Sequence, residues 1–162
     1  MNKREPMWVI GWREWVALPE FGVDAIKAKI DTGARSLALH AFNMKRFRRR
    51  GVRMVRFEIH PIQRSSSDSV TVEAKVIEDR TVRSSNGKVE RRPVIRTTIK
   101  MYDREWDIEL TLTNRDEMGF RMLLGRQALS KRFLIDAGRS FLTGRPKTTL
   151  PAKKAIRKRS KT

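Results

Sequence analysis

A carboxylate, a hydroxyl and a residue without a Cβ stand side by side at Asp31-Thr32-Gly33, and Ala34 follows them. A tight turn of this kind can present Asp31 from a rigid element into a cleft, where burial and a like-charged neighbour would act on its carboxyl group. We therefore take Asp31, Thr32 and Gly33 as candidate catalytic residues. The alternative is an ordinary β-turn, because these residue types are common in turns of all proteins.

The segment before this turn alternates between apolar and basic residues. Ile26, Ala28 and Ile30 fall on one side, and Lys27 and Lys29 fall on the other. A period of two predicts a β-strand with one buried face, so Asp31 should stand at the end of a strand.

Most of the remaining chain consists of short apolar segments separated by turn residues, and Asn86-Gly87 is a strong hairpin signal because both residue types tolerate positive φ. Many short strands and one late helix indicate an all-β barrel or sandwich. We predict strands within residues 7–18 (a pair), 25–30, 37–41, 52–60, 70–77, 82–83, 89–92, 94–101, 106–113, 122–126, 133–136 and 140–142, and a helix over 127–131.

Composition sets outer limits on the class of protein. A length of 162 residues suits one domain, and 39% hydrophobic residues fit a globular core with a charged surface. The sequence has no apolar run long enough to span a bilayer and no secretory pattern at its N-terminus. It also has no cysteine, which excludes disulfides and thiolate metal sites. We expect a cytoplasmic protein that does not enter a membrane.

The formal charge of +19 is concentrated in two segments, residues 45–53 and 146–162. From residue 146 onward the chain has little apolar content, so we predict a basic disordered tail over 146–162 behind a domain of residues 1–145. This charge would attract a polyanion: nucleic acid, an anionic surface or an acidic polypeptide. The alternative is a solvated surface that keeps the protein soluble.

Five blocks of sequence follow one another in a characteristic order: Gly11 to Glu14, Ile26 to His40, Ser84 to Gly87, Leu112 to Asp116 and Met122 to Arg126. The sequence resembles the retropepsins, which are single-lobe aspartic peptidases, and more closely a bacterial retropepsin-like family labelled "ATP-dependent zinc protease". The resemblance covers residues 8–145 and implies a closed β-barrel of one lobe with a short C-terminal helix.

An aspartic peptidase needs two carboxylates that share one proton. This chain has one Asp-Thr-Gly, so the resemblance implies a homodimer in which each copy supplies Asp31. The family also implies that Thr32 braces the turn through its hydroxyl, that Gly33 lets the backbone approach the two carboxylates, and that Ala34 lies beneath the substrate backbone.

The resemblance further implies a flap over the cleft, formed by the hairpin tip Ser84 to Gly87, and a supporting role for Gly125-Arg126 beside Asp31 from within the sheet. The residues that we expect to bind substrate are Lys29, Ala34, Arg35, Ser85, Asn86, Gly87 and Arg126.

Two other motifs compete for a chemical role. Asp136-Ala137-Gly138 has the shape of a second Asp-x-Gly turn, but Ala137 lacks the hydroxyl that Thr32 provides. The two histidines, His40 and His60, lack the spacing of a zinc site, and we expect His40 to be a strand residue or to line the rim of the active site. No phosphate-binding glycine loop is present either, so we predict neither a metal nor a cofactor.

Basic residues close to the motifs suggest the substrate. Lys27, Lys29 and Arg35 lie near Asp31 in sequence, and Arg121 and Arg126 lie near Gly125. If several face the cleft, an acidic peptide would gain charge-assisted contacts; otherwise they are solvated strand residues. Members of the family are associated with ATP-grasp ligases that add glutamates to proteins. The resemblance therefore implies a glutamate-tailed substrate such as a ribosomal protein, with the ligase as a possible partner.

The alternative function is a binding module without catalysis. The same fold would then hold RNA, the ribosome or acidic peptides, with phosphate contacts made by Arg48-Arg49-Arg50 and the basic tail. Aromatic residues make up only 7% of the sequence, and the sequence shows no legible stacking motif.

Overall fold

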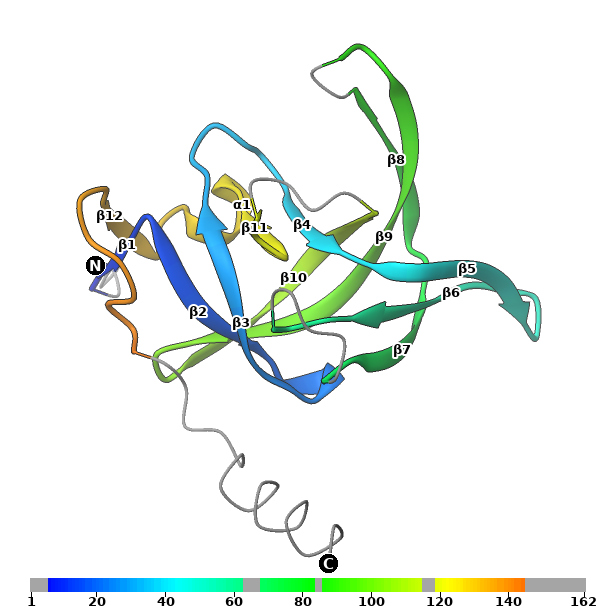
Figure 1. Ribbon diagram of the computed structural model, residues 1–162, viewed down its shortest axis with the longest axis horizontal. Helices are drawn as coiled ribbons and strands as arrows, with labels where there is room; N and C mark the ends of the chain where they lie inside the picture. Colours follow the sequence, from blue (N-terminus) through cyan, green and yellow to red (C-terminus); the bar gives the residue numbers. More distant parts are fainter. Residues whose placement is uncertain (1–5, 63–67, 84–85, 115–118, 145–162) are drawn as a thin grey trace, which may run out of the picture.

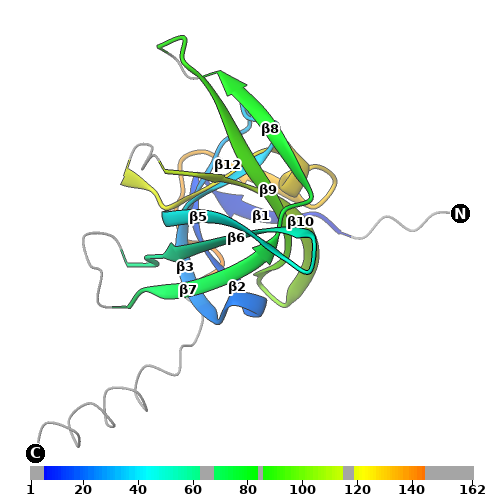
Figure 2. The same cartoon turned by 90° about the vertical axis from the view of Figure 1, so that its right-hand side faces the viewer.

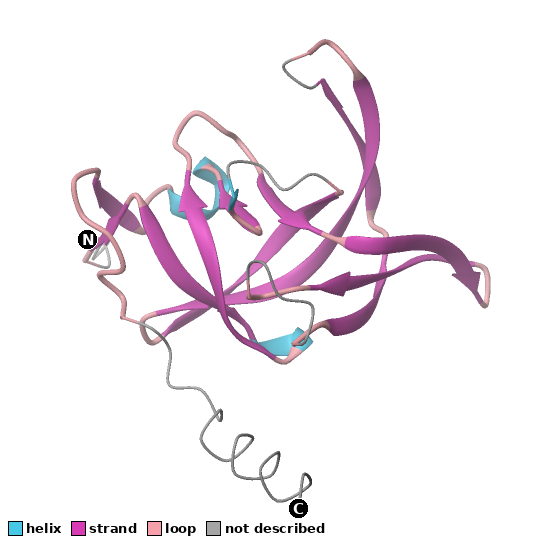
Figure 3. Ribbon diagram, in the orientation of Figure 1, coloured by secondary structure: helices cyan, strands magenta, loops and turns pink. Residues whose placement is uncertain are grey.

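A computed structural model describes residues 6–62, 68–83, 86–114 and 119–144. The prediction of an all-β fold is confirmed, and strands dominate the molecule (Figure 3). The elements are β1 (Trp8–Gly11), β2 (Arg13–Leu18), the 3-10 helix η1 (Pro19–Phe21), β3 (Val23–Ile30), β4 (Leu37–His40), β5 (Phe42–Arg49), β6 (Val52–Ile59), β7 (Val70–Lys75), β8 (Glu78–Arg83), β9 (Val89–Met101), β10 (Arg104–Thr113), β11 (Met122–Leu124), α1 (Arg126–Leu129) and β12 (Phe133–Asp136).

Six strands close into a barrel, as expected (Figure 1). Their order is β10, β4, β11, β3, β2 and β9, and β9 pairs back onto β10 to complete the ring. β11 is the key short element, because it lies between β3, with which it is parallel, and β4, with which it is antiparallel.

The barrel core follows the alternation seen in the sequence. In β3, Ile26, Ala28 and Ile30 are buried, whereas Lys27 and Lys29 remain half-buried on the other side of the strand. The inward residues pack with Leu37, Leu39 and many others into a single apolar cluster. Their burial fixes the register of β3 and with it the place where Asp31 leaves the sheet.

Two smaller sheets lie beside the barrel. β5, β6 and β7 form an antiparallel sheet that extends away from it (Figure 1). β1 forms a parallel pair with β12. The predicted pairing of two strands within residues 7–18 is therefore wrong, because β1 pairs with the C-terminal β12 and β2 pairs with β3. The predicted strand over 140–142 is also wrong, since these residues have no strand conformation and the Leu142 N–H donates to a Glu14 side-chain oxygen instead.

The hairpin around Asn86-Gly87 is confirmed, and its strands β8 and β9 pair from Glu78↔Val94 to Arg83↔Val89. Gly87 has a φ of 83°, as a tight turn at this position requires. Ser84 and Ser85 lie outside the described residues. Figure 2 shows the same hairpin rising above the rest of the molecule.

The late helix is confirmed as one turn, Arg126–Leu129, and it begins one residue earlier than predicted. The basic tail predicted over 146–162 lies outside the described residues. Among the residues that the structure describes, no helix has the length and apolar character needed to cross a membrane.

Candidate active site

Asp31 leaves β3 at its C-terminal end and opens the loop that leads to β4. Its side chain is half-buried. Its backbone N–H donates to the Leu124 carbonyl at 2.9 Å, which continues the β3–β11 pairing one residue beyond the strand. The sheet therefore fixes the backbone of Asp31 directly.

The turn closes on the Asp31 side chain. Asp31 Oδ1 accepts a hydrogen bond from the Gly33 N–H at 2.9 Å, and the Asp31 carbonyl accepts one from the Ala34 N–H at 3.2 Å. An added Cβ on Gly33 would lie 3.2 Å from Asp31 Oδ1, tighter than most Cβ contacts. One carboxylate oxygen of Asp31 thus orients the turn.

Gly125 supports the loop from behind. A Cβ at this position would lie 2.3 Å from the Ser36 carbonyl oxygen and 2.8 Å from the Ala34 carbonyl oxygen. The backbones meet at a distance that only glycine allows. The next two amides donate to the loop as well, Arg126 N–H to the Ala34 carbonyl at 2.8 Å and Gln127 N–H to the Arg35 carbonyl at 3.0 Å.

Arg126 adds a side-chain contact to the same loop. Its guanidinium Nη1 donates to the Thr32 carbonyl at 2.9 Å, and the side chain is exposed. We expected Gly125-Arg126 to act from within the sheet. This is wrong for Arg126, which is the first residue of α1, because β11 ends at Leu124 and Gly125 already caps the helix.

The loop brings five of the predicted site residues together with Asp31. Thr32, Gly33 and Arg35 are exposed, Ala34 is half-buried, and Arg126 bonds the loop from α1. The hydrogen bond found at Thr32 uses its carbonyl, so the role of its hydroxyl stays a prediction.

The other substrate-binding candidates come from two different elements. Lys29 lies on β3, on the side that faces away from the barrel core. Asn86 and Gly87 lie at the tip of the β8–β9 hairpin, which stands at the upper end of the molecule in Figure 1, as does the loop between β3 and β4. Ser85 lies outside the described residues, so the structure does not place it.

Two of the basic residues considered near the site are held by aromatic rings instead. Lys27 Nζ lies 5.5 Å from the Trp15 ring centroid and 5.7 Å from that of Phe141. Arg121 Cζ lies 4.9 Å from the Phe42 ring centroid. These cations pack against the rings, whereas Arg35 belongs to the Asp31 loop and Arg126 bonds to it.

The competing turn at Asp136 uses the same backbone device. Asp136 Oδ1 accepts from the Gly138 N–H at 3.1 Å, and a Cβ on Gly11 would lie 2.1 Å from the Arg139 carbonyl oxygen. The pair of Gly11 and the Asp136 turn thus repeats the arrangement of Gly125 and the Asp31 turn. Asp136 is exposed, whereas Asp31 is half-buried, and Ala137 has no hydroxyl where the first turn has Thr32. The second turn therefore lacks both the half-buried carboxylate and the hydroxyl of the first.

Both histidines stack on a single phenylalanine. The Phe42 ring centroid lies 4.1 Å from that of His40 and 3.8 Å from that of His60. His40 is buried at the end of β4, in agreement with its prediction as a strand residue. The stack joins the barrel to the β5–β6 hairpin.

Sequence reasoning missed Asp79, which connects the β8–β9 hairpin to the β5–β6 hairpin. Its side chain, 10% exposed, pairs with Arg46 at 2.7 Å and Arg53 at 2.9 Å, and with Arg91 of β9 at 3.2 Å. Burial acts to raise the pKa of Asp79, but hydrogen bonding and charge from Arg46, with Arg53 and Arg91, lower this pKa below its ordinary value. A lone aspartate in a basic sequence gave no signal of this arrangement.

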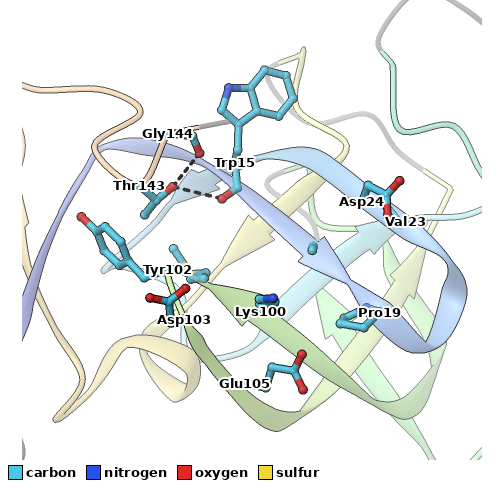
Figure 4. Close-up of a pocket in the computed structure, with 12 residues that line it drawn as sticks. Trp15, Pro19, Val23, Asp24, Lys100, Tyr102, Asp103, Glu105, Thr143 and Gly144 are labelled. Atoms are coloured by element: carbon cyan, nitrogen blue, oxygen red, sulfur yellow. Dashed lines mark hydrogen bonds between the residues drawn. The ribbon is translucent and has the colours of Figure 1, made fainter. Parts of the chain in front are cut away.

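A groove of about 480 Å³ borders the N-terminal end of β3. Trp15, Asp24 and Lys100 line it, and the side chains of Tyr102 and Glu105 also face it (Figure 4). Since Val23 at the start of β3 borders the groove and Asp31 follows the end of β3, the groove is separate from the candidate site.

Comparison with curated proteins finds relatives at about half identity. A "probable alpha-L-glutamate ligase" of Shewanella halifaxensis is 50% identical over 136 residues, which is 84% of this chain and 30% of that protein. Proteins of the same name from Desulfotalea psychrophila and Parasynechococcus marenigrum are 48% and 46% identical, over 79% and 84% of this chain. The chain thus spans less than a third of the length of these relatives.

A solved structure shares the fold. A Legionella pneumophila protein of unknown function (DUF785) superposes with a TM-score of 0.69 at 27% identity, covering 84% of this chain and 98% of the other. A family model described as "retropepsin-like aspartic endopeptidase RimB" matches residues 9–146, which contain both the barrel and the Asp31 loop. The chain therefore belongs to the RimB-like family of retropepsin-like proteins.

Proposed function

We propose that this protein is an aspartic endopeptidase that works as a homodimer in the cytoplasm and cleaves acidic or glutamate-tailed polypeptides. One observation carries the proposal: a loop bonded to β11, Gly125 and α1 presents the half-buried Asp31 carboxylate at the end of a barrel strand. A rigidly held carboxylate is the group that this reaction requires.

The reaction needs two such carboxylates. One removes a proton from a water molecule as the water attacks the peptide carbonyl, and the other, initially protonated, gives its proton to the leaving amine. Since Asp31 belongs to the one Asp-Thr-Gly in the sequence, a two-fold dimer would supply the second copy. Thr32, Gly33 and Ala34 would line the same site, and Asn86-Gly87 would cover the bound peptide.

Charge and the curated relatives support an acidic substrate. Arg35 and Arg126 flank the Asp31 loop, and a glutamate side chain could pair with either. The relatives at about half identity are named for glutamate ligation, and this chain matches a segment of them. We infer that the peptidase cleaves a glutamate tail that a ligase adds. The leading candidate for the substrate is a glutamate-tailed ribosomal protein, and an ATP-grasp ligase would be a partner.

The test is to incubate the full chain with a peptide that carries a glutamate tail and with the same peptide without the tail, and to follow cleavage by mass spectrometry. We expect cleavage of the tailed peptide only. The Asp31→Asn variant should lose at least about a thousandfold in rate while it keeps the same fold, since it cannot supply an ionised carboxylate.

Asp136→Asn is the matched control, because Asp136 occupies a turn of the same geometry. It should keep its activity. The proposal would be contradicted if Asp31→Asn cleaved the tailed peptide as fast as the unchanged protein does. It would also be contradicted if the protein formed a dimer that cleaved neither peptide.

The second candidate is a binding module without catalysis, and the exposed arginines of the β5–β6 hairpin favour it. Such a module would hold RNA, the ribosome or acidic peptides, and Asp31→Asn would leave its binding unchanged. Cleavage that is lost in Asp31→Asn and kept in Asp136→Asn identifies the peptidase, whereas a binding module cleaves neither peptide.

A further inference from the structure

The solvent-facing side of the β5–β6–β7 sheet combines an aromatic ring with positive charge. Directly opposite residues on neighbouring strands point to the same side of a sheet. Phe47 lies opposite Met54, and Met54 lies opposite Lys75. Lys45 lies opposite Arg56 on the same side. We call these five residues, with Arg49, the outer face.

The outer face is turned away from the protein core. Val55, Phe57 and Ile59 alternate with Met54 and Arg56 along β6 and are fully buried on the other side. By contrast, Lys45, Arg56 and Lys75 are exposed, and Phe47 and Met54 are only half-buried. Two apolar side chains thus meet solvent beside three cations, and the exposed Glu73 lies opposite Arg56 on the same side.

Arg49 completes the arrangement. Its guanidinium lies 5.3 Å from the Phe47 ring centroid, and Glu73 of β7 holds it at 2.6 Å. The Arg49 side chain is still 56% exposed. A ring and a guanidinium plane therefore lie together on the sheet surface, and both are groups on which a nucleobase can stack.

We propose that the outer face binds single-stranded nucleic acid. A base stacks on Phe47 and Arg49, and the phosphates that follow pair with Lys45, Arg56 and Lys75. The antiparallel sheet fixes the spacing between the ring and the cations, so the backbone of the nucleic acid runs across the strands. Proteins that bind single strands combine a basic surface with aromatic side chains in this way.

The apolar part of the face favours a nucleic acid over an acidic peptide. Glutamate side chains would pair with Lys45, Arg56 and Lys75 but would gain little from Phe47 and Met54. A nucleobase uses both kinds of group. This site lies on a separate sheet from the Asp31 loop, so the inference goes beyond the peptidase function and does not depend on it.

The test is fluorescence anisotropy with labelled oligouridine and oligothymidine of about 12 nucleotides, within the range that single-strand sites cover. With the full chain, Phe47→Ala should weaken binding about tenfold, the loss expected for one stacked base. Lys45→Gln with Arg56→Gln should also weaken it about tenfold and flatten the salt dependence by a slope of about 1 to 2.

Lys100→Gln with Lys131→Gln is the matched control, because it removes the same charge from exposed positions on other elements. It should change binding less than about twofold. Phe47→Leu keeps the apolar volume without the ring and should weaken binding like Phe47→Ala, and thermal unfolding of each variant verifies the fold. Oligouridine and oligothymidine that bind alike would mark the single strand itself as the ligand, and tighter binding of one would identify RNA or DNA.

Three outcomes would overturn the proposal. The Phe47 variants could bind as the unchanged protein does, the control pair could weaken binding as much as the outer-face pair, or oligoglutamate could displace the oligonucleotide at equal charge concentration. Asp31→Asn should leave binding intact, so a failure here is distinct from a failure of the peptidase proposal.

Discussion

Gly125 and Gly11 lie at the ends of β11 and β1, and each packs directly against the backbone at an Asp-x-Gly turn because glycine has no Cβ. At Gly125 a Cβ would lie 2.3 Å from the Ser36 carbonyl oxygen, which cannot move without shifting the Asp31 loop. We expect Gly125→Ala to destabilise the fold by about 1–3 kcal/mol, the usual cost of overpacking. We also expect it to lower peptidase activity about a hundredfold, because small displacements of a catalytic group are costly. Urea unfolding and the tailed-peptide assay measure the two effects.

Gly11→Ala and Gly138→Ala are the controls for this prediction. Gly11→Ala introduces a similar clash at Arg139, so it should destabilise the fold but leave the activity of the folded fraction largely intact. Gly138→Ala makes an ordinary contact at 3.6 Å and should be tolerated. If Gly125→Ala and Gly11→Ala lost activity equally, the special role of the β11–α1 junction would be refuted.

At the scale of elements, Asp79 joins two hairpins that the barrel alone does not connect. Asp79→Asn leaves Arg46, Arg53 and Arg91 without their shared carboxylate. These arginines are 44–73% exposed, so water partly replaces the lost contacts, and we expect a cost of about 1–2 kcal/mol. Faster amide hydrogen exchange should appear in β8 and at the β5–β6 tip, and unchanged exchange there would argue against the connection.

The same carboxylate makes a prediction for pH. Because the pKa of Asp79 is lowered in the folded protein, its stabilising effect is complete above the unfolded pKa of about 3.9. The effect is lost as the pH falls through the lower pKa of the folded state. The difference in unfolding free energy between the unchanged protein and Asp79→Asn should therefore be constant above about pH 5 and shrink below about pH 4. A difference that grew on acidification would contradict this assignment.

At the scale of the whole molecule, the proposed site is complete only in a dimer. Mixing equal amounts of the unchanged protein and Asp31→Asn, with time for subunit exchange, should leave about a quarter of the dimers with two intact carboxylates. Peptidase activity at constant total protein should then fall to about a quarter of that of the unchanged protein. Activity of one half would mean that each chain works alone, and analytical ultracentrifugation would report the assembly directly.

The strands that the sequence predicted best are those with a clear period of two. Ile26, Ala28 and Ile30 predicted β3 because a half-buried strand demands that alternation. Partners along the sheet were harder to predict, because pairing across the barrel depends on distant segments. The N-terminal β1 pairs with β12, more than a hundred residues away, and no local pattern encodes this contact.

In the candidate site, too, local features were predicted from the sequence and contacts between distant segments were not. The motif Asp31-Thr32-Gly33 and Gly125, which follows β11, were visible because each depends on residue type at a fixed position. The role of Arg126 was placed wrongly in the sheet, since the end of a three-residue strand is decided by packing. Asp79 was missed because its three arginines come from β5, β6 and β9.

By itself, the sequence determined the all-β class, the strand that carries Asp31 and the turn that follows it, because local geometry and side-chain alternation are written in neighbouring residues. Only the tertiary structure decided which cations face which surface. It placed Lys27 on Trp15, gathered three arginines on Asp79, and set Phe47 among cations on an open sheet. The physical reason is that strand register and barrel closure bring distant segments together. The number of charges in a sequence does not specify which surface each charged side chain faces.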